Sequence, residues 1–93
     1  MVQATWNNEI IAESADTIMV EGNHYFPIAA VRPDVLKPSA TTSVCGWKGT
    51  AQYYWVLAGG AENPDAAWYY ASPKDAAANI KGRVAFSKGV KVA

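Results

Sequence analysis

Residues whose side chains could do chemistry crowd into the stretch TTSVCGWKGTAQYYWV, from Thr41 to Val56. It holds the only cysteine of the chain, Cys45, and Lys48 follows three residues later. Because Gly46 and Gly49 lie in this segment, we expect Cys45, Trp47 and Lys48 on a tight turn that enters a strand. An ammonium group near the sulfur would favour the thiolate, the nucleophilic form of cysteine. The structural alternative is a small buried Cys45, a core Trp47 and a solvated lysine.

Two other stretches could add to this turn. Glu21 and Tyr25 lie on either side of a predicted turn, where a carboxylate beside a phenol could position a polar ligand or act as a general base. The alternative for Glu21 is to cap backbone N–H groups of the turn. Trp68 and the tyrosines after it could line a pocket for a planar ligand or form a sticky surface, or they could simply pack over the sheet. We expect the turn and the Trp68 strand to converge.

Several kinds of chemistry are disfavoured by the residues present. One cysteine and one histidine, His24, cannot make a protein-only tetrahedral site of nitrogen and sulfur ligands. There is no Gly-x-Ser-x-Gly elbow, no phosphate loop and no His-Glu-x-x-His motif. We therefore expect no metal ion and no cofactor, and we take His24 as a surface residue. Whether the chain is an enzyme stays open.

Length and charge limit the number of domains and the kinds of partner that the chain could have. The 93 residues predict one domain, residues 1–93, and eight basic residues balance eight acidic ones. A chain without net charge is poorly suited to tracking phosphates, so nucleic-acid binding is disfavoured. No apolar run reaches the about 18 residues of a membrane span, and the N-terminus lacks the pattern of a signal peptide. We expect a cytoplasmic protein with no membrane partner.

The hydrophobic pattern is short and β-like, with turn residues between the runs. It predicts strands at Ala4–Trp6, Ile10–Glu13, Thr17–Glu21, His24–Pro27, Thr50–Leu57, Ala67–Tyr70, Arg83–Ser87 and Val90–Val92, the last two as a closing hairpin. One helix is predicted from Ser72 as N-cap to Gly82, and a short helical turn after Pro33, ended by Pro38. The fold class is mainly β, a small antiparallel barrel or rolled sheet with one short capped helix.

The predicted central strand assigns its side chains to two faces. Because successive side chains of a strand point to opposite sides, we expect an apolar core face on one side and a face of mixed polarity on the other. The expected core face holds Ala51, Tyr53, Trp55 and Leu57, and the mixed face holds Thr50, Gln52, Tyr54 and Val56. In the later strand, Trp68 and Tyr70 should share a face while Tyr69 points away.

Four segments in order resemble a known family. VEGNHYFP, TTSVCGWKGTAQYY, AWYYASP and IKGRVAF resemble the small bacterial proteins of the domain-of-unknown-function family numbered 427. The matching positions are Glu21, Tyr25, Pro27, Thr42, Cys45, Lys48, Gly49, Ala51, Tyr53, Trp68, Tyr70, Pro73, Ile80, Gly82 and Phe86. Gly46 departs from a proline that often precedes the family's tryptophan. The family's occasional nucleotidyltransferase-like label fits poorly, because the chain has neither a Gly-Ser turn nor an Asp-x-Asp pair for Mg²⁺.

Three functional hypotheses follow. The first is a small-molecule-binding domain whose pocket is lined by Cys45, Trp47, Lys48, Glu21, Tyr25 and Trp68, with Tyr53 as a further candidate. The second is a structural or protein-interaction module, including a homo-oligomer, that uses the aromatic surface. The third is a thiol-dependent enzyme with Cys45 as nucleophile.

Overall fold

The computed structural model describes all residues, 1–93. Nine strands and three short 3₁₀ helices follow one another along the chain. They are β1 (Val2–Trp6), β2 (Glu9–Ser14), β3 (Ile18–Val20), β4 (Asn23–Tyr25), η1 (Ile28–Ala30), η2 (Pro33–Val35), β5 (Leu36–Cys45), β6 (Gly49–Ala58), β7 (Ala61–Tyr69), η3 (Asp75–Ile80), β8 (Val84–Phe86) and β9 (Lys91–Val92). The chain is thus mainly β, as the sequence predicts.

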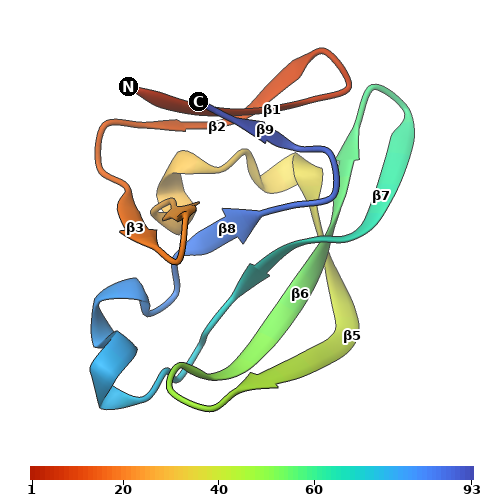
Figure 1. Cartoon of the computed structure of the whole chain (residues 1–93). Coiled ribbons are helices and arrows are strands. Elements are labelled where there is room, and N and C mark those ends of the chain that lie inside the picture. The colour runs from red at the N-terminus through yellow and green to blue at the C-terminus, as the bar shows by residue number, and fades with distance from the viewer.

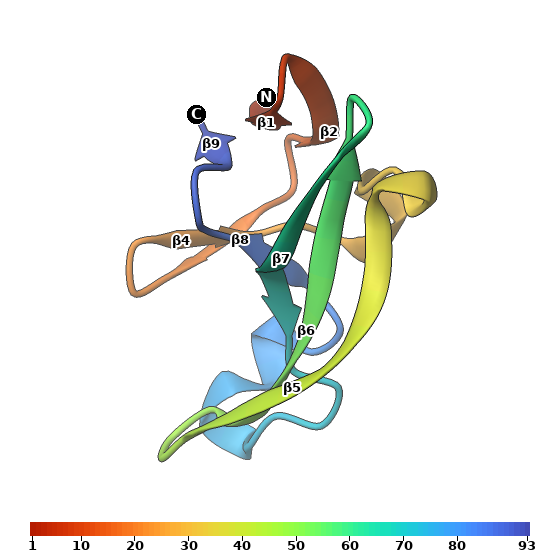
Figure 2. The ribbon, with the colours of Figure 1, turned by 90° about the vertical axis from the view of Figure 1, so that its right-hand side faces the viewer.

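A four-stranded antiparallel sheet, in the order β5-β6-β7-β8, forms the body of the molecule. Its three long strands run through the right half of Figure 1 and twist strongly around one another, as the turned view in Figure 2 shows. The two outer strands, β5 and β8, do not pair with each other, so the sheet is rolled and does not close into a barrel. β5 and the first half of β7 were not predicted.

Two smaller sheets complete the fold. A three-stranded sheet, β2-β1-β9, lies at one end of the long sheet, and β3 and β4 form a separate hairpin (Figures 1 and 2). The predicted closing hairpin is wrong, because β8 joins the long sheet whereas β9 pairs with β1, Ala4 opposite Val92. The two chain ends therefore lie side by side (Figure 1). No helix in the structure is long and apolar enough to cross a membrane.

The core consists of two clusters on opposite faces of the long sheet. The larger one packs the N-terminal sheet against the second half of β6, including Val56 and Ala58. The smaller one lies over the first half of β6, where Ala51 and Tyr53 pack with residues of β4 and η3. The segments that cover β6 lie on one face in its first half and on the other face in its second half. Both faces of β6 therefore carry buried side chains. The prediction that Trp55 and Leu57 continue the core face is wrong, since both stay half-buried outside the clusters.

The predicted capped helix is also corrected. Only Asp75–Ile80 is helical, as a 3₁₀ segment with a kink at Ala77, and Lys74 stands at its N-cap without a side-chain cap bond. The segment buries Ala77 and Ile80 in the smaller cluster, which favours a tight turn over a regular helix. The short turn after Pro33 is confirmed as Pro33–Val35, but the chain then continues as β5 through Pro38.

The turn between β6 and β7 gives a sharp test of this packing. Gly59 has φ +59°, and a Cβ there would overlap the side-chain amide of Asn7, which donates to the carbonyl of Ala58 at 2.9 Å. We expect Gly59→Ala to cost about 1–3 kcal/mol of unfolding free energy in urea denaturation. Gly60→Ala is the matched control, because its φ of +78° is similar but its Cβ would meet open space. Equal losses in the two variants would contradict the Asn7 contact.

Candidate functional site

The turn between β5 and β6 places Lys48 in the interior. Cys45 pairs with Gly49 across the hairpin, and the positive φ of Gly49 lets the chain reverse there, as the sequence predicts. Lys48 is only 7% exposed, the one charged residue in the buried set. Its Nζ donates to Oε1 of Glu21, and it lies 5.6 Å from the ring centres of both Trp47 and Tyr70. The aromatic rings and one carboxylate thus surround a buried cation.

Glu21 is the partner that keeps Lys48 charged. It projects from the turn of the β3-β4 hairpin, with half of its side chain exposed, and also accepts a hydrogen bond from the indole of Trp47 at 3.4 Å. The bond from Lys48 lowers the pKa of Glu21. Burial alone would lower the pKa of Lys48, but its bond to Glu21 and the nearby Tyr25 and Tyr70 outweigh that effect and raise it. Both groups are therefore ionised at neutral pH.

Trp68 joins the same region from β7. It lies opposite Tyr53 of β6, and its indole donates to the hydroxyl of Tyr25 at 3.2 Å. The rings of Tyr25 and Trp68 meet edge to face, with centroids 6.4 Å apart. Trp68 and Tyr70 pack in the smaller cluster, whereas Tyr69 turns to the other face and stacks on Tyr54. The predicted faces of this strand are confirmed.

A cavity of about 420 Å³ opens beside these groups. Its volume lies within the range of small-molecule sites. Its walls combine three aromatic rings with charged and hydroxyl groups: Thr41, Lys48, Tyr53, Asp65, Trp68, Tyr70, Ser87 and Lys88. Three of the predicted candidates, Lys48, Tyr53 and Trp68, line it directly.

The other candidates lie around the cavity and not in its wall. Glu21 and Trp47 contact Lys48 from outside, and Tyr25 is fully buried behind Trp68. Cys45 packs, partly buried, against the smaller cluster, and no hydrogen bond joins its sulfur to Lys48, whose ammonium is turned to Glu21. The structure therefore shows no direct bond between the ammonium of Lys48 and the thiol of Cys45.

Sequence reasoning missed the polar half of this cavity. Thr41 lies on β5, which was not predicted, and Asp65 lies between two predicted strands, where no element was assigned. Ser87 and Lys88 follow β8 and were assigned to a hairpin. Tyr70 was considered with Trp68 as a possible pocket residue but was not included among the candidate site residues. The dipeptide Pro64-Asp65 was the one available signal, because proline inside a strand often marks a bulge.

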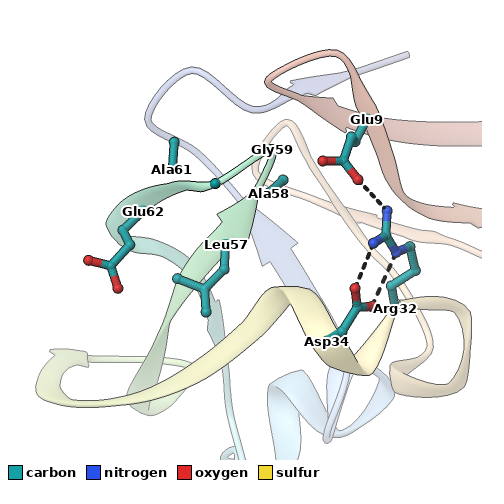
Figure 3. Close-up of a pocket in the computed structure, with 9 residues that line it drawn as sticks. Glu9, Arg32, Asp34, Leu57, Ala58, Gly59, Ala61 and Glu62 are labelled. Carbon is teal, nitrogen blue, oxygen red and sulfur yellow. Dashed lines mark hydrogen bonds and ion pairs between the residues drawn. The ribbon is translucent and has the colours of Figure 1, made fainter.

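A second hollow, about 640 Å³ in volume, lies at the other end of the long sheet. Figure 3 shows Arg32 between Glu9 and Asp34, with dashed lines to both carboxylates. Arg32 bonds Glu9 through Nη1 at 2.9 Å and Asp34 through Nε and Nη2, at 3.2 and 2.6 Å. These pairs satisfy one another and tie η2 to β2 (Figure 3). We therefore place the candidate site in the smaller cavity, where the buried Lys48 meets the aromatic rings of Tyr53 and Trp68.

These features define a small, mainly β domain with one mixed aromatic and polar cavity. A family model described as Domain of unknown function (DUF427), and named NTP_transf_9, matches residues 1–93. The chain belongs to this family, as the four sequence segments indicate. No curated protein matches the chain.

The family name suggests nucleotidyl transfer, and the metal ligands that this reaction needs can be compared with the residues in the cavity wall. Nucleotidyl transfer by the usual route needs neighbouring carboxylates that hold Mg²⁺. Asp65 is the single carboxylate in the wall, and nowhere in the structure do three His, Cys, Asp or Glu side chains gather as metal ligands. The residues at this cavity therefore do not fit that metal-dependent reaction.

Proposed function

We propose that this domain binds a small polar molecule in the cavity formed by β5, β6, β7 and the segment after β8. The observation that carries the proposal is the burial of Lys48 against Trp47 and Tyr70 at the edge of that cavity. Removing an ammonium group from water costs free energy. A core without function would be served as well by an apolar residue, whereas a binding site needs a fixed hydrogen-bond donor.

The aromatic rings support the same conclusion. Tyr53 and Trp68 leave part of their surface accessible and line the cavity, although each is held from behind. Trp68 is fixed by Tyr25, and the hydroxyl of Tyr53 shares a hydrogen bond with Ser43 at 2.8 Å. Side chains that are held in one position lose little freedom when a ligand binds. The cavity wall is thus preorganised for a flat or ring-shaped molecule.

A melting-temperature screen against sugars, amino acids, nucleotides and common cofactors tests the proposal. A compound at about 100 times its dissociation constant adds about 2.7 kcal/mol, and each kcal/mol raises the midpoint by about 4–8 °C. We expect a clear shift in the natural protein and its loss in Lys48→Met. This variant should fold, because methionine replaces the buried stem and Glu21 stays hydrated.

The control is Lys81→Met, which removes a lysine that is exposed and outside the cavity. It should keep the shift. A flat response to every compound, or a shift that survives in Lys48→Met, would contradict the proposed site. A flat response would favour the second hypothesis, an interaction module, for which the mass in solution is the next measurement.

A further inference from the structure

Tyr70 brings to the cavity a hydroxyl group whose proton has no acceptor in the protein. The residue lines the cavity and is 4% exposed, and Nζ of Lys48 lies 5.6 Å from the centre of its ring. Burial raises the pKa of Tyr70 more than the charge of Lys48 lowers it, so the O–H is intact at neutral pH. Its polar neighbours are Lys48, which can only donate, the hydroxyl of Tyr25 and the thiol of Cys45. None of them accepts a hydrogen bond from Tyr70.

The two lysines of the wall supply further donors. An ammonium group has three N–H bonds and no acceptor. Lys48 directs one N–H at Glu21, and Lys88 directs one at the carbonyl of Pro64, at 3.3 Å. Each lysine therefore keeps N–H groups for a ligand. Together with Tyr70 they give the wall three donor groups, and two of the three are charged.

The acceptors of the wall, in contrast, are already engaged within the protein. Oδ2 of Asp65 accepts from the hydroxyl of Thr41 at 2.9 Å, and Oδ1 is shielded from solvent. Hydrogen bonds from Ser39 and Thr41 lower the pKa of Asp65, so its carboxylate is ionised with its own partners in place. The hydroxyl of Tyr53 shares a hydrogen bond with Ser43. The cavity thus offers more free donors than free acceptors.

This imbalance narrows the chemistry of the ligand. The ammonium of an amino acid and the hydroxyls of a sugar bring donors of their own, for which the wall has no open acceptor. A phosphate monoester only accepts, but its charge of nearly two would face Asp65 and Glu21 as well as the lysines. A carboxylate carries one charge and accepts at both oxygens, and its bonds from charged donors are strong.

On the basis of the proposed function, we infer that the ligand is a monocarboxylate on a flat ring, and that its carboxylate accepts hydrogen bonds from Tyr70 and Lys48. The ring packs on Tyr53 and Trp68, which line the same cavity. Tyr70 is thus a binding residue. It distinguishes an acceptor from a donor, because its O–H stays unpaired when the ligand presents only N–H groups.

Three compounds with one carbon skeleton test the inference: 3-phenylpropionate, its amide, and phenylalanine, which is the same acid with an added ammonium. Molecules of this size should bind with dissociation constants of about 1 mM, so NMR titration of the labelled protein up to about 30 mM detects them. We expect 3-phenylpropionate to bind most tightly. The amide should bind about 5-fold more weakly, because it accepts without a charge. Phenylalanine should also be weaker, because its ammonium meets two lysines.

Tyr70→Phe removes the hydroxyl and keeps the ring in its cluster, so the variant should fold. It should weaken the binding of 3-phenylpropionate about 10-fold, the value of a hydrogen bond to a charged group. The matched control is Tyr54→Phe, which removes the hydroxyl of a tyrosine outside the cavity, stacked on Tyr69. This control should leave the affinity unchanged.

Several results would overturn the inference. Tighter binding of phenylalanine than of 3-phenylpropionate would show that the wall takes up an ammonium. Equal affinities for the acid and its amide, or for Tyr70→Phe and the natural protein, would contradict the carboxylate contact, and so would no binding of the acid at all. In each case the proposed function stands if a compound of the melting screen binds in a manner sensitive to Lys48→Met, and falls if none does.

Discussion

Replacing Trp68 with alanine is expected to weaken ligand binding roughly 30-fold, the effect of losing about 2 kcal/mol at an aromatic anchor. Trp68 lines the cavity and is held by the hydroxyl of Tyr25 at 3.2 Å. The variant loses the surface on which a ring would pack, and the hydroxyl of Tyr25 loses its donor. Stability should also fall, by about 2–3 kcal/mol, because the side chain is partly buried in the smaller cluster.

Two further variants separate binding from folding in this experiment. Trp68→Phe keeps an aromatic face but loses the indole N–H, so it should retain most of the affinity. Trp55→Ala removes a tryptophan of β6 that lies outside the cavity. The Nζ atom of Lys37 lies 4.9 Å from the centre of its ring. The variant should leave the affinity unchanged. Calorimetry measures the ligand affinity of the three variants, and circular dichroism checks that each is folded. Unchanged affinity in Trp68→Ala would contradict the assignment of Trp68 to the binding site.

The largest loss of stability is expected for Phe26→Ala, about 3–5 kcal/mol out of a total of about 5–14 kcal/mol for a domain of this length. Phe26 is fully buried and meets Phe86 edge to face, at 5.6 Å between centroids. Its backbone also bonds Val84 in both directions, at 2.8 and 2.9 Å. Phe26 therefore attaches the segment after β4 to the long sheet.

This attachment matters for the site because Tyr25 is the next residue. Tyr25 belongs to the smaller cluster and Phe26 to the larger one, so the two neighbours join both halves of the core. Urea denaturation measures the effect. Ile28→Ala, at an exposed position just after Phe26, is the control and should change stability by no more than about 0.5 kcal/mol. A loss below about 1 kcal/mol in Phe26→Ala would contradict this role.

Several features of the fold and site follow from local sequence. The alternating apolar pattern predicts most strands of the N-terminal third, and the glycines around Lys48 predict the turn between β5 and β6. Period-two alternation correctly separates Trp68 and Tyr70 from Tyr69. The expected meeting of the Lys48 turn with the Trp68 strand is observed in one cavity wall. These features depend on a few neighbouring residues, which is why the sequence alone predicts them.

Other features depend on contacts between distant segments. β5 reads as a polar stretch, because it is an edge strand and most of its side chains are exposed. The core changes faces along β6 because different sheets cover its two halves, which alternation along one strand cannot show. The pairing of β9 with β1 joins the two ends of the chain. Asp65 joins the cavity wall through the folded sheet, which brings it to Thr41, 24 residues away in the chain.

In the proposed site, a small polar molecule binds between Lys48 and Asp65, over Tyr53 and Trp68. The most direct measurement is an NMR titration of the ¹⁵N-labelled protein with the compound that gives the largest melting shift. The chain has four tryptophans and so four indole N–H signals, and Trp68→Phe identifies the one from Trp68. We predict that this signal moves on titration while those of Trp6 and Trp55 stay in place. Movement of the Trp6 or Trp55 signal with a stationary Trp68 signal would contradict binding in this cavity.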